Sequence, residues 1–358
     1  MSERIKEFQK TLQKKELDAY LVTNTTNVYY FTNFFSRSAA YLEIFPGSTP
    51  HLYVPELEYE EALSRAKFCE ISKVEKQSDV FQEIKKDLET VQVKKLGIEE
   101  TSMNVKTYQD LVQKYNFPKL ENGSDLIDEL RKIKYKDEID KIKKACQMAD
   151  NGIAKAMEAI EEGKAEVQVA GEVEYAMRKA GSESIPFDTI IASGYRSAFP
   201  HGTSSDKKIK QGDLIIIDLG AKYGGYASDI TRTVVLGAPS TRQQELFDTV
   251  LNVQQSAIKA CLVGEKAMDI EEQVRKTLTE RKYEEYFVHS LGHGVGLDVH
   301  ELPYVSVKSK DVLVENNVFT IEPGVYIPDF GGVRIEDTLV LKKEGPKILT
   351  RAKYTFEI

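Results

Sequence analysis

The sequence predicts two domains, a small α/β domain over residues 1–125 and an α+β domain over residues 126–358. A chain of 358 residues is longer than a single hydrophobic core usually supports. A polar stretch, KLENGSD, marks the boundary after the first unit. Beyond it, the order helix, helix, strand, glycine-rich loop and hairpin occurs twice. This repeated order predicts pseudo-twofold symmetry, with a curved and mainly antiparallel sheet covered by helices.

The first domain is expected to begin with a charged amphipathic helix, roughly from Arg4 to Lys15. Strands are expected at AYLVT, at AAYLEIF and, after the turn PGSTP, at HLYVP. Two further helices bracket the segment KKLGIEE. None of these segments gathers polar residues with an evident chemistry, and the candidate functional residues come from the second domain.

The second domain starts with a helix over 136–162, where apolar residues recur at helical spacing. A second helix through EVQVAGEVEYAMRKA is expected to stop at Gly181, which suits the position after a helix end. A strand near PFDTIIA, a glycine-rich loop and two strands around KYGGY follow. These elements form the first half of the repeat.

The second half repeats that order. One helix is expected after the Ser240/Thr241 cap, and another after Asp269, with Glu272 three positions on as its capping partner. A strand near YEEYFVH, the glycine-rich loop LGHGVG and two strands around PDFGG complete it. Each half therefore supplies one hairpin, and sites commonly lie where such halves meet.

Two carboxylates flank the turn of the first hairpin. Asp218 ends the apolar run LIIID, which is typical of a buried strand. If residues 223–224 are central in the turn, Asp218 lies opposite Asp229. If 224–225 are central, as the glycine preference favours, Asp218 faces Thr231 and Asp229 is a diagonal neighbour on the same face. Either register brings together two like charges that repel unless something positive lies between them.

The second hairpin repeats this pattern with Glu322 and Glu336, and His293 lies in the glycine-rich loop. Four carboxylates and one imidazole suit a bridged pair of Mn, Co, Fe or Zn ions better than a lone structural zinc. Such a pair lowers the pKa of a shared water and polarises a scissile carbonyl. The alternative is that these are acidic residues at strand ends, paired with Arg232 and Arg334. The occurrence of all five in matched positions favours the metal interpretation.

Two histidines, His201 in SGYRSAFPHG and His300 in HEL, lie beside the proposed site. Both could donate hydrogen bonds to the substrate carbonyl or carry a proton to the leaving nitrogen. We interpret His51 and His289 as structural. Thr231 could hydrogen-bond Asp229 or a bridging ligand.

The composition excludes several classes of protein. The formal charge of −8 argues against nucleic acid or an anionic membrane surface as a partner. The start, MSERIKEFQKTLQKKEL, has no apolar core of a signal peptide, and no apolar run approaches membrane-spanning length. Cys69, Cys146 and Cys261 form no CxxC pair, which indicates reduced core cysteines in a cytoplasmic protein.

The segments 214–233, 288–303 and 319–341, with the PHG around His201, resemble those of the pita-bread metallopeptidases. That family includes methionine aminopeptidase, aminopeptidase P and prolidase. The resemblance covers residues of roughly 125 to 358 strongly, and the preceding domain is more loosely similar to the creatinase/prolidase N-terminal domain. It implies the pita-bread fold for the second domain.

The resemblance also implies roles for the site residues. Asp218 and Asp229 would bind one metal, with Asp229 and Glu336 bridging to the second. His293 would complete the coordination together with Glu322, which resembles the proton acceptor from a metal-bridging water that acts as the nucleophile. His201 and His300 match positions that bind substrate and intermediate. Two divalent ions per subunit are expected, Mn or Co before Zn or Fe.

The N-terminal domain is typical of the proline-specific members, which often form homodimers. The resemblance therefore implies short proline-containing peptides as substrates. Because the bond before proline has no N–H to recognise, such an enzyme would recognise the ring by shape and apolar contact. We expect a Xaa-Pro dipeptidase. The alternative is a Xaa-Pro aminopeptidase, since Tyr304 stands in HELPY where several prolidases have an arginine for the dipeptide carboxylate. Arg37 or Arg334 could supply that charge. A hypothesis of another class is a catalytically silent peptide-binding module.

Overall fold

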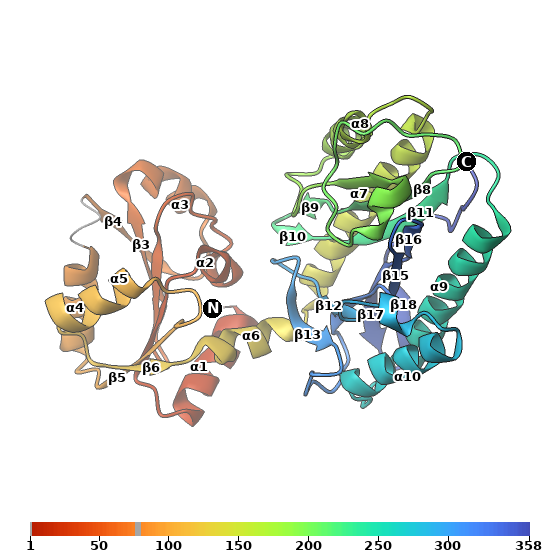
Figure 1. Cartoon of the computed structure of the whole chain (residues 1–358). Coiled ribbons are helices and arrows are strands. Elements are labelled where there is room, and N and C mark those ends of the chain that lie inside the picture. Colours follow the sequence, from red (N-terminus) through yellow and green to blue (C-terminus); the bar gives the residue numbers. More distant parts are fainter. Residues whose placement is uncertain (1, 76–79) are drawn as a thin grey trace. The chain divides into compact units, whose positions relative to one another are not determined.

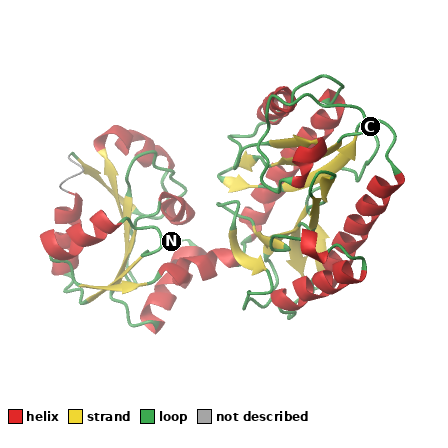
Figure 2. Cartoon of the chain, viewed as in Figure 1, coloured by secondary structure: helices red, strands yellow, loops and turns green. Residues whose placement is uncertain are grey.

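The computed structural model describes residues 2–75 and 80–358, in which the chain forms two units, Met1–Leu130 and Arg131–Ile358 (Figure 1). Each unit contains helices and its own sheet strands (Figure 2). Among the described residues, no helix combines the length and the apolar character that crossing a membrane requires. The cysteines are free thiols, of which Cys146 and Cys261 are buried and Cys69 is half-buried.

The first unit is built on a six-stranded mixed sheet in the order β4-β3-β2-β1-β5-β6. Its strands are β1 (Ala19–Val22), β2 (Tyr41–Ile44), β3 (His51–Pro55), β4 (Glu70–Val74), β5 (Lys95–Ile98) and β6 (Lys119–Asn122). Its helices are α1 (Glu3–Lys14), α2 (Thr25–Thr32), α3 (Tyr59–Arg65), α4 (Val80–Thr90), α5 (Val105–Gln109) and α6 (Ser124–Lys132), with a 3-10 turn at Glu56–Glu58 and a π-helical turn at Asp110–Lys114.

The three strands expected in this unit are confirmed as β1, β2 and β3, and the first helix as α1. The polar stretch KLENGSD, expected to close this unit, forms the edge strand β6 and the start of α6, and the two units divide after Leu130. An edge strand needs only one apolar face, so a short polar strand of this kind carries little periodic signal.

The second unit pairs its named strands antiparallel throughout the described range 131–358. Its strands are β7 (Ile190–Ser193), β8 (Leu214–Leu219), β9 (Lys222–Tyr223), β10 (Tyr226–Ala227), β11 (Ile230–Val235), β12 (Gly292–Gly294), β13 (Glu301–Val305), β14 (Val318–Ile321), β15 (Gly324–Ile327), β16 (Gly331–Arg334), β17 (Asp337–Lys342) and β18 (Gly345–Ile348). Its helices are α7 (Lys136–Ala159), α8 (Glu166–Lys179), α9 (Thr241–Ala260) and α10 (Ala267–Glu280), with 3-10 turns η3 (Gly194–Ala198) and η4 (Glu284–Tyr286).

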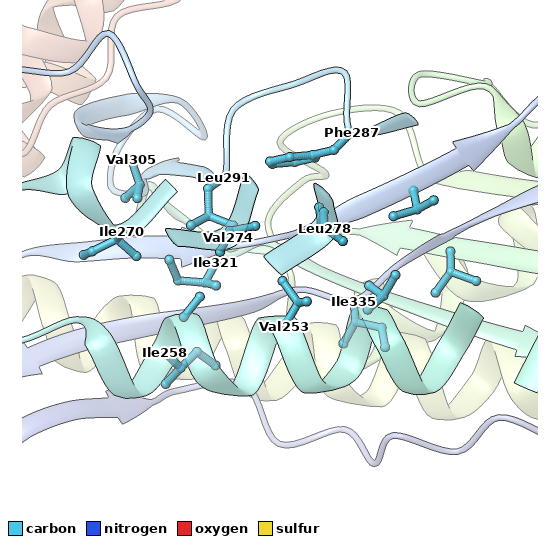
Figure 3. Close-up of a cluster of buried hydrophobic side chains, with 14 of the residues drawn as sticks. Val253, Ile258, Ile270, Val274, Leu278, Phe287, Leu291, Val305, Ile321 and Ile335 are labelled. Carbon is cyan, nitrogen blue, oxygen red and sulfur yellow. The ribbon is translucent and has the colours of Figure 1, made fainter. Parts of the chain in front are cut away.

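Two hydrophobic cores reflect the repeated element order. Helices α7 and α8 pack on alternate residues of β8 and β11, such as Ile215 and Ile217. Helices α9 and α10 pack on β14 and β17 in the same way. Figure 3 shows part of this second core, where Val253 of α9, Val274 of α10 and Ile321 of β14 point into the same space. Because strand side chains alternate, the residues between these apolar ones point to the opposite sheet face.

The expected helix ends at Ser240 and Gly181 are confirmed in the second unit. Three other expectations, for Asp269, YEEYFVH and LGHGVG, are wrong. Ser240 caps α9 with Gln243 as its partner, and Gly181 follows α8 with φ +105°. Asp269, however, lies in the first turn of α10, which begins at Ala267. The segment YEEYFVH contains η4 instead of a strand, and part of the glycine-rich loop LGHGVG forms β12. Short apolar runs distinguish poorly between such elements.

Candidate metal centre

The first hairpin brings Asp218 and Asp229 to one sheet face. Gly224 and Gly225 occupy the turn with φ of +56° and +79°, as the glycine-centred register requires. Asp218 pairs with Thr231 across β8 and β11, so the second of the two expected registers is correct. Asp229 is two residues before Thr231 and therefore lies on the same face.

The second hairpin places its carboxylates directly opposite each other. Ile321 pairs with Asp337 across β14 and β17, and Gly324 pairs with Arg334 across β15 and β16. Glu322 and Glu336 occupy the next position in this shared register, at the break between the two strand pairs. Both carboxylates thus stand where the ladder is interrupted and point to the face opposite the helices.

His293 is held on β12 between two glycines that must remain glycines. A Cβ on Gly292 would lie 2.0 Å from the carbonyl oxygen of Thr320, and one on Gly294 would lie 2.2 Å from that of Leu302. The ring Nδ1 is 3.2 Å from the carbonyl oxygen of Gly294, which makes Nδ1 the donor. Nε2 then faces Glu322 Oε1 at 3.1 Å and Asp229 Oδ2 at 3.6 Å.

Three carboxylate oxygens at this centre are buried without a hydrogen-bond partner among the described residues. They are Oδ1 of Asp218, Oδ1 of Asp229 and Oε1 of Glu336, and we call them the open oxygens. Ligand atoms of Asp229, His293 and Glu336 all lie within 4.8 Å of one another. Burial, and then the neighbouring carboxylates, raise the pKa values of Asp229 and Glu336 well above their ordinary values. A buried acceptor left open is unfavourable, so this donor set fits divalent cations.

Within residues 2–75 and 80–358, only Asp218 forms the salt bridge with Arg232 or Arg334 that the alternative interpretation expects. Arg334 Nη2 donates to Asp218 Oδ2 at 2.6 Å. Arg232, the other expected partner, instead donates to Asp337 Oδ1 at 2.8 Å on the helix-covered face. Among the described residues, Asp229 forms an ion pair with neither arginine, and the group that approaches it is His293 Nε2, 3.6 Å from Asp229 Oδ2.

Residues from each half orient the carboxylates of the other half. Thr231 of β11 donates to Glu336 Oε2 at 2.6 Å, so this threonine binds the second of its two expected partners. Arg334 of β16 binds Asp218 of β8, as described above. Thr338 of β17 donates to the carbonyl oxygen of Asp229 at 2.7 Å. The two half-sites are therefore tied together by buried hydrogen bonds.

The remaining predicted site residues line a cavity of about 410 Å³ over this centre. His201, His300, Tyr304 and Arg334 all contribute to its wall. The ring of His300 lies 4.2 Å from that of His293, centroid to centroid. Partial burial, followed by the neighbouring His293, lowers the pKa of His300 below its usual range. A neutral His300 ring at pH 7 can both accept and donate a proton.

His289, which the sequence interpretation treated as structural, also lines this cavity. Its Nδ1 lies 2.8 Å from the carbonyl oxygen of Ser290, so its Nε2 accepts from the Tyr326 hydroxyl at 2.8 Å. Arg334 in turn donates to that hydroxyl at 2.7 Å. Its position four residues before His293, just ahead of the GHG segment, was the only sequence signal for this role.

The loop that carries His201 is fastened by the buried carboxylate of Glu166 at the start of α8. Glu166 accepts from the backbone N–H and the hydroxyl of Ser193 at 2.8 Å each, and from Arg196 Nε at 3.0 Å. On the far side of the loop it accepts from the hydroxyl of Ser205 at 2.6 Å. These bonds fix both ends of the segment that presents His201 to the cavity.

Comparisons with known proteins identify two protein families, a relative and two solved structures that are similar to this chain. A model of metallopeptidase family M24 matches residues 140–343, and one of the creatinase/prolidase N-terminal domain matches residues 4–133. The chain is 44% identical over 353 residues to a Xaa-Pro dipeptidase of Pyrococcus furiosus, which covers 99% of each chain. It is similar to the solved prolidase of Pyrococcus horikoshii OT3, with a TM-score of 0.93, 44% identity and coverage of 98% and 99%. The solved X-Pro aminopeptidase of Thermotoga maritima MSB8 is also similar, with a TM-score of 0.89, 35% identity and coverage of 96% and 98%.

Proposed function

The chain belongs to metallopeptidase family M24, and we propose that it is a Xaa-Pro dipeptidase that hydrolyses the bond before a C-terminal proline. The observation that carries the hydrolytic chemistry is the convergence of the three open oxygens with His293 on one buried face. Dipeptidase activity in particular is supported by the 44% identity to proteins named Xaa-Pro dipeptidase and prolidase.

Within this proposal, two divalent ions are held by Asp218, Asp229, His293, Glu322 and Glu336. Mn or Co is our first expectation for these ions, with Zn or Fe as alternatives, because the oxygen-rich set accepts several. When bound, such ions supply Lewis-acid chemistry to a peptide carbonyl and lower the pKa of water. The chain's own residues contribute orientation and proton transfer.

Proton transfer is assigned to three side chains. Glu322 lies 3.1 Å from His293 Nε2 and lines the cavity over the centre. Its carboxylate is therefore placed to accept a proton from the attacking water. His201 and His300 line the same cavity as Glu322. We assign them to hydrogen-bond the substrate carbonyl and to protonate the leaving proline nitrogen.

Substrate size and the proline ring are assigned to the cavity wall. Phe187 and Ile190 line it and offer an apolar surface to a ring that has no N–H to donate. Tyr304, 43% exposed at the rim, is assigned to hydrogen-bond the dipeptide carboxylate. Arg334 remains a candidate for that charge, although its donors bind Asp218 and Tyr326.

The second candidate function is a Xaa-Pro aminopeptidase that acts on longer peptides. Tyr304 favours it, because a phenol does not neutralise a free carboxylate as a guanidinium would. A catalytically silent binding module is disfavoured, because all five candidate ligand residues are present.

The test compares hydrolysis of a Xaa-Pro dipeptide with that of a Xaa-Pro-Xaa tripeptide after loading the purified chain with Mn, Co or Zn. Cleavage of the dipeptide supports the proposal. Exclusive cleavage of the tripeptide would establish the aminopeptidase instead, and failure to bind any of the metals would exclude both.

The setting of the enzyme completes the proposal. We assign residues 1–125 to a creatinase/prolidase-like N-terminal domain and residues 126–358 to the catalytic domain. We expect a cytoplasmic homodimer that acts on short proline-containing peptides and binds neither nucleic acid nor membrane, in keeping with the formal charge of −8.

A further inference from the structure

We propose that the first unit carries a separate divalent-cation site formed by Glu43, His51 and Asp87. No sequence motif in this unit indicates such a site, since these residues are spread over 45 positions and three elements. One ligand atom from each lies within 4.8 Å of the others. The site does not depend on the catalytic centre or on the function proposed for it.

The three residues meet because of the strand register and the packing of α4. Glu43 of β2 pairs directly with His51 of β3, so both point to the same sheet face. Helix α4 covers this face with Ile84 and Leu88, which share a hydrophobic core with Tyr53 of β3. Asp87, between them on α4, lies over the Glu43–His51 pair.

Glu43 is the observation that points to a ligand. Its side chain is fully buried, and its Oε1 has no hydrogen-bond partner within the described ranges 2–75 and 80–358. Its other oxygen, Oε2, is 2.7 Å from the Tyr53 hydroxyl. A carboxylate buried with an open oxygen needs a proton or a cation to be stable there.

The Tyr53 hydroxyl cannot satisfy both acids. It lies 2.7 Å from Glu43 and 2.5 Å from Asp87 Oδ2, yet it has one proton to donate. Asp87 has a second partner in His51 Nδ1 at 3.1 Å, so the carboxylate left short of a donor is Glu43 with its open Oε1. A cation bound to both carboxylates removes this deficit and leaves the hydroxyl free to donate to either.

His51 supplies the nitrogen ligand and an opening to solvent. Its Nε2 is 2.7 Å from the Ser72 hydroxyl, and its Nδ1 is 3.1 Å from Asp87 Oδ2. With Ser72 bonded to Nε2, Nδ1 is directed at the carboxylates, as a metal-ligating histidine with an outer hydrogen bond usually is. The side chains of His51 and Asp87 are 24% and 40% exposed, which gives an ion a path to the buried Glu43.

Two carboxylates and one imidazole match a first-row divalent ion with an open coordination position, and zinc is the probe of choice. Bound zinc would connect β2, β3 and α4, and would stabilise the folded unit because it binds the folded chain preferentially.

The experiment measures zinc per chain after equilibration and gel filtration of the full-length protein. Asp87→Asn is the main variant, because it removes the charge of a half-exposed side chain and keeps its size, and His51→Gln is the second. Each should carry one zinc fewer than the wild-type chain. Glu89→Gln, a carboxylate on the same helix that pairs only at 3.5 Å with Lys85, should keep the wild-type amount.

A chain with Asp229→Asn and His293→Ala separates this site from the catalytic centre. It should lose catalytic zinc yet keep the equivalent that depends on Asp87, and zinc should still raise its melting temperature. Zinc contents that are equal in the wild-type, Asp87→Asn and His51→Gln chains would overturn the proposal, whatever the catalytic centre does. Loss of zinc from the catalytic positions alone would bear on the proposed function and leave this site standing.

Discussion

Glu336 and Asp337 are neighbours in sequence, point to opposite faces of the same sheet and are both buried, yet their surroundings differ completely. Asp337, on the helix-covered face, accepts from Arg232, Gln254, Thr350 and Tyr354 at 2.6 to 2.8 Å. Glu336, on the other face, accepts from Thr231 and keeps one open oxygen. A buried charge is tolerated either when protein donors satisfy it or when a ligand does.

Whether protein donors satisfy both carboxylate oxygens distinguishes structural acids from candidate metal ligands better than burial alone does. Glu166 is fully buried and the side chain of Glu301 is 9% exposed, but side-chain or backbone donors satisfy both. The three open oxygens all belong to residues that the sequence selected as ligands. The contrast between the two faces can be tested by equivalent substitutions on each.

The largest effect is expected from Asp229→Asn on the open face. Removal of this charge should lower kcat/KM by roughly 10³-fold or more, about 4 kcal/mol in activation free energy. The free energy of unfolding of the metal-free chain should not fall, because the change relieves repulsion with Glu336 and Asp218. Peptidase assays and denaturant titrations in chelator measure the two quantities. Near-normal turnover would contradict a ligand role.

Asp337→Asn is the matched change on the satisfied face. It leaves the buried Arg232 guanidinium without its charge partner, which should cost about 3–5 kcal/mol of unfolding free energy. Turnover per folded, metal-loaded molecule should stay within about tenfold of the wild-type value. If Asp337→Asn lost activity as Asp229→Asn does while keeping its stability, the distinction between the faces would fail.

Glu301→Gln extends the comparison to pH. Arg131 Nη2 lies 2.5 Å from Glu301 Oε2, and Lys134 Nζ lies 2.8 Å from Glu301 Oε1. Burial raises the pKa of Glu301, but these two cations together lower it below its ordinary value of 4.5. The ionised form thus stabilises the fold above pH 4.5, and this contribution is lost as the pH falls through the lower folded-state pKa. The variant should be less stable by about 3 kcal/mol at pH 7. Its deficit should shrink in acid; a deficit independent of pH would argue against the charge pairing.

The smallest effect is expected from Tyr304→Arg at the rim of the cavity. This substitution adds a positive charge and leaves the buried acids on both faces of the sheet unchanged. The ratio of kcat/KM for a Xaa-Pro dipeptide to that for a tripeptide should rise about tenfold, since a guanidinium binds a free carboxylate more strongly than a phenol does. Metal content should not change. Parallel assays of the two substrates give the ratio, and an unchanged ratio would remove Tyr304 from the carboxylate subsite.

The candidate ligands could be selected from the sequence because charge on an apolar strand is conspicuous within a few residues. Asp218 after LIII and Glu336 near the end of the second hairpin are of this kind. The glycine pair at 224–225 even selected the correct register. The sequence does not predict which acid each arginine binds, because Arg232 and Arg334 both lie near acidic residues in the sequence. Their partners differ because the two side chains point to different faces of the sheet.

Other features depend on contacts between distant segments. His289 joins the cavity through Tyr326, 37 residues away, and Asp87 reaches Glu43 only because α4 packs on β2 and β3. No local periodicity records such contacts. The polar strand β6 was missed for the opposite reason, since it has little apolar pattern of its own.

The exchange of hydrogen bonds between the two hairpins has a consequence for how the protein matures. Thr231 orients Glu336, Arg334 orients Asp218, and Thr338 holds the backbone of Asp229. A chain in which only one half has folded therefore has carboxylates in neither the right place nor the right orientation. We expect the chain to bind metal only after the two halves have packed together. A partly folded chain would then bind no metal and would have no peptidase activity.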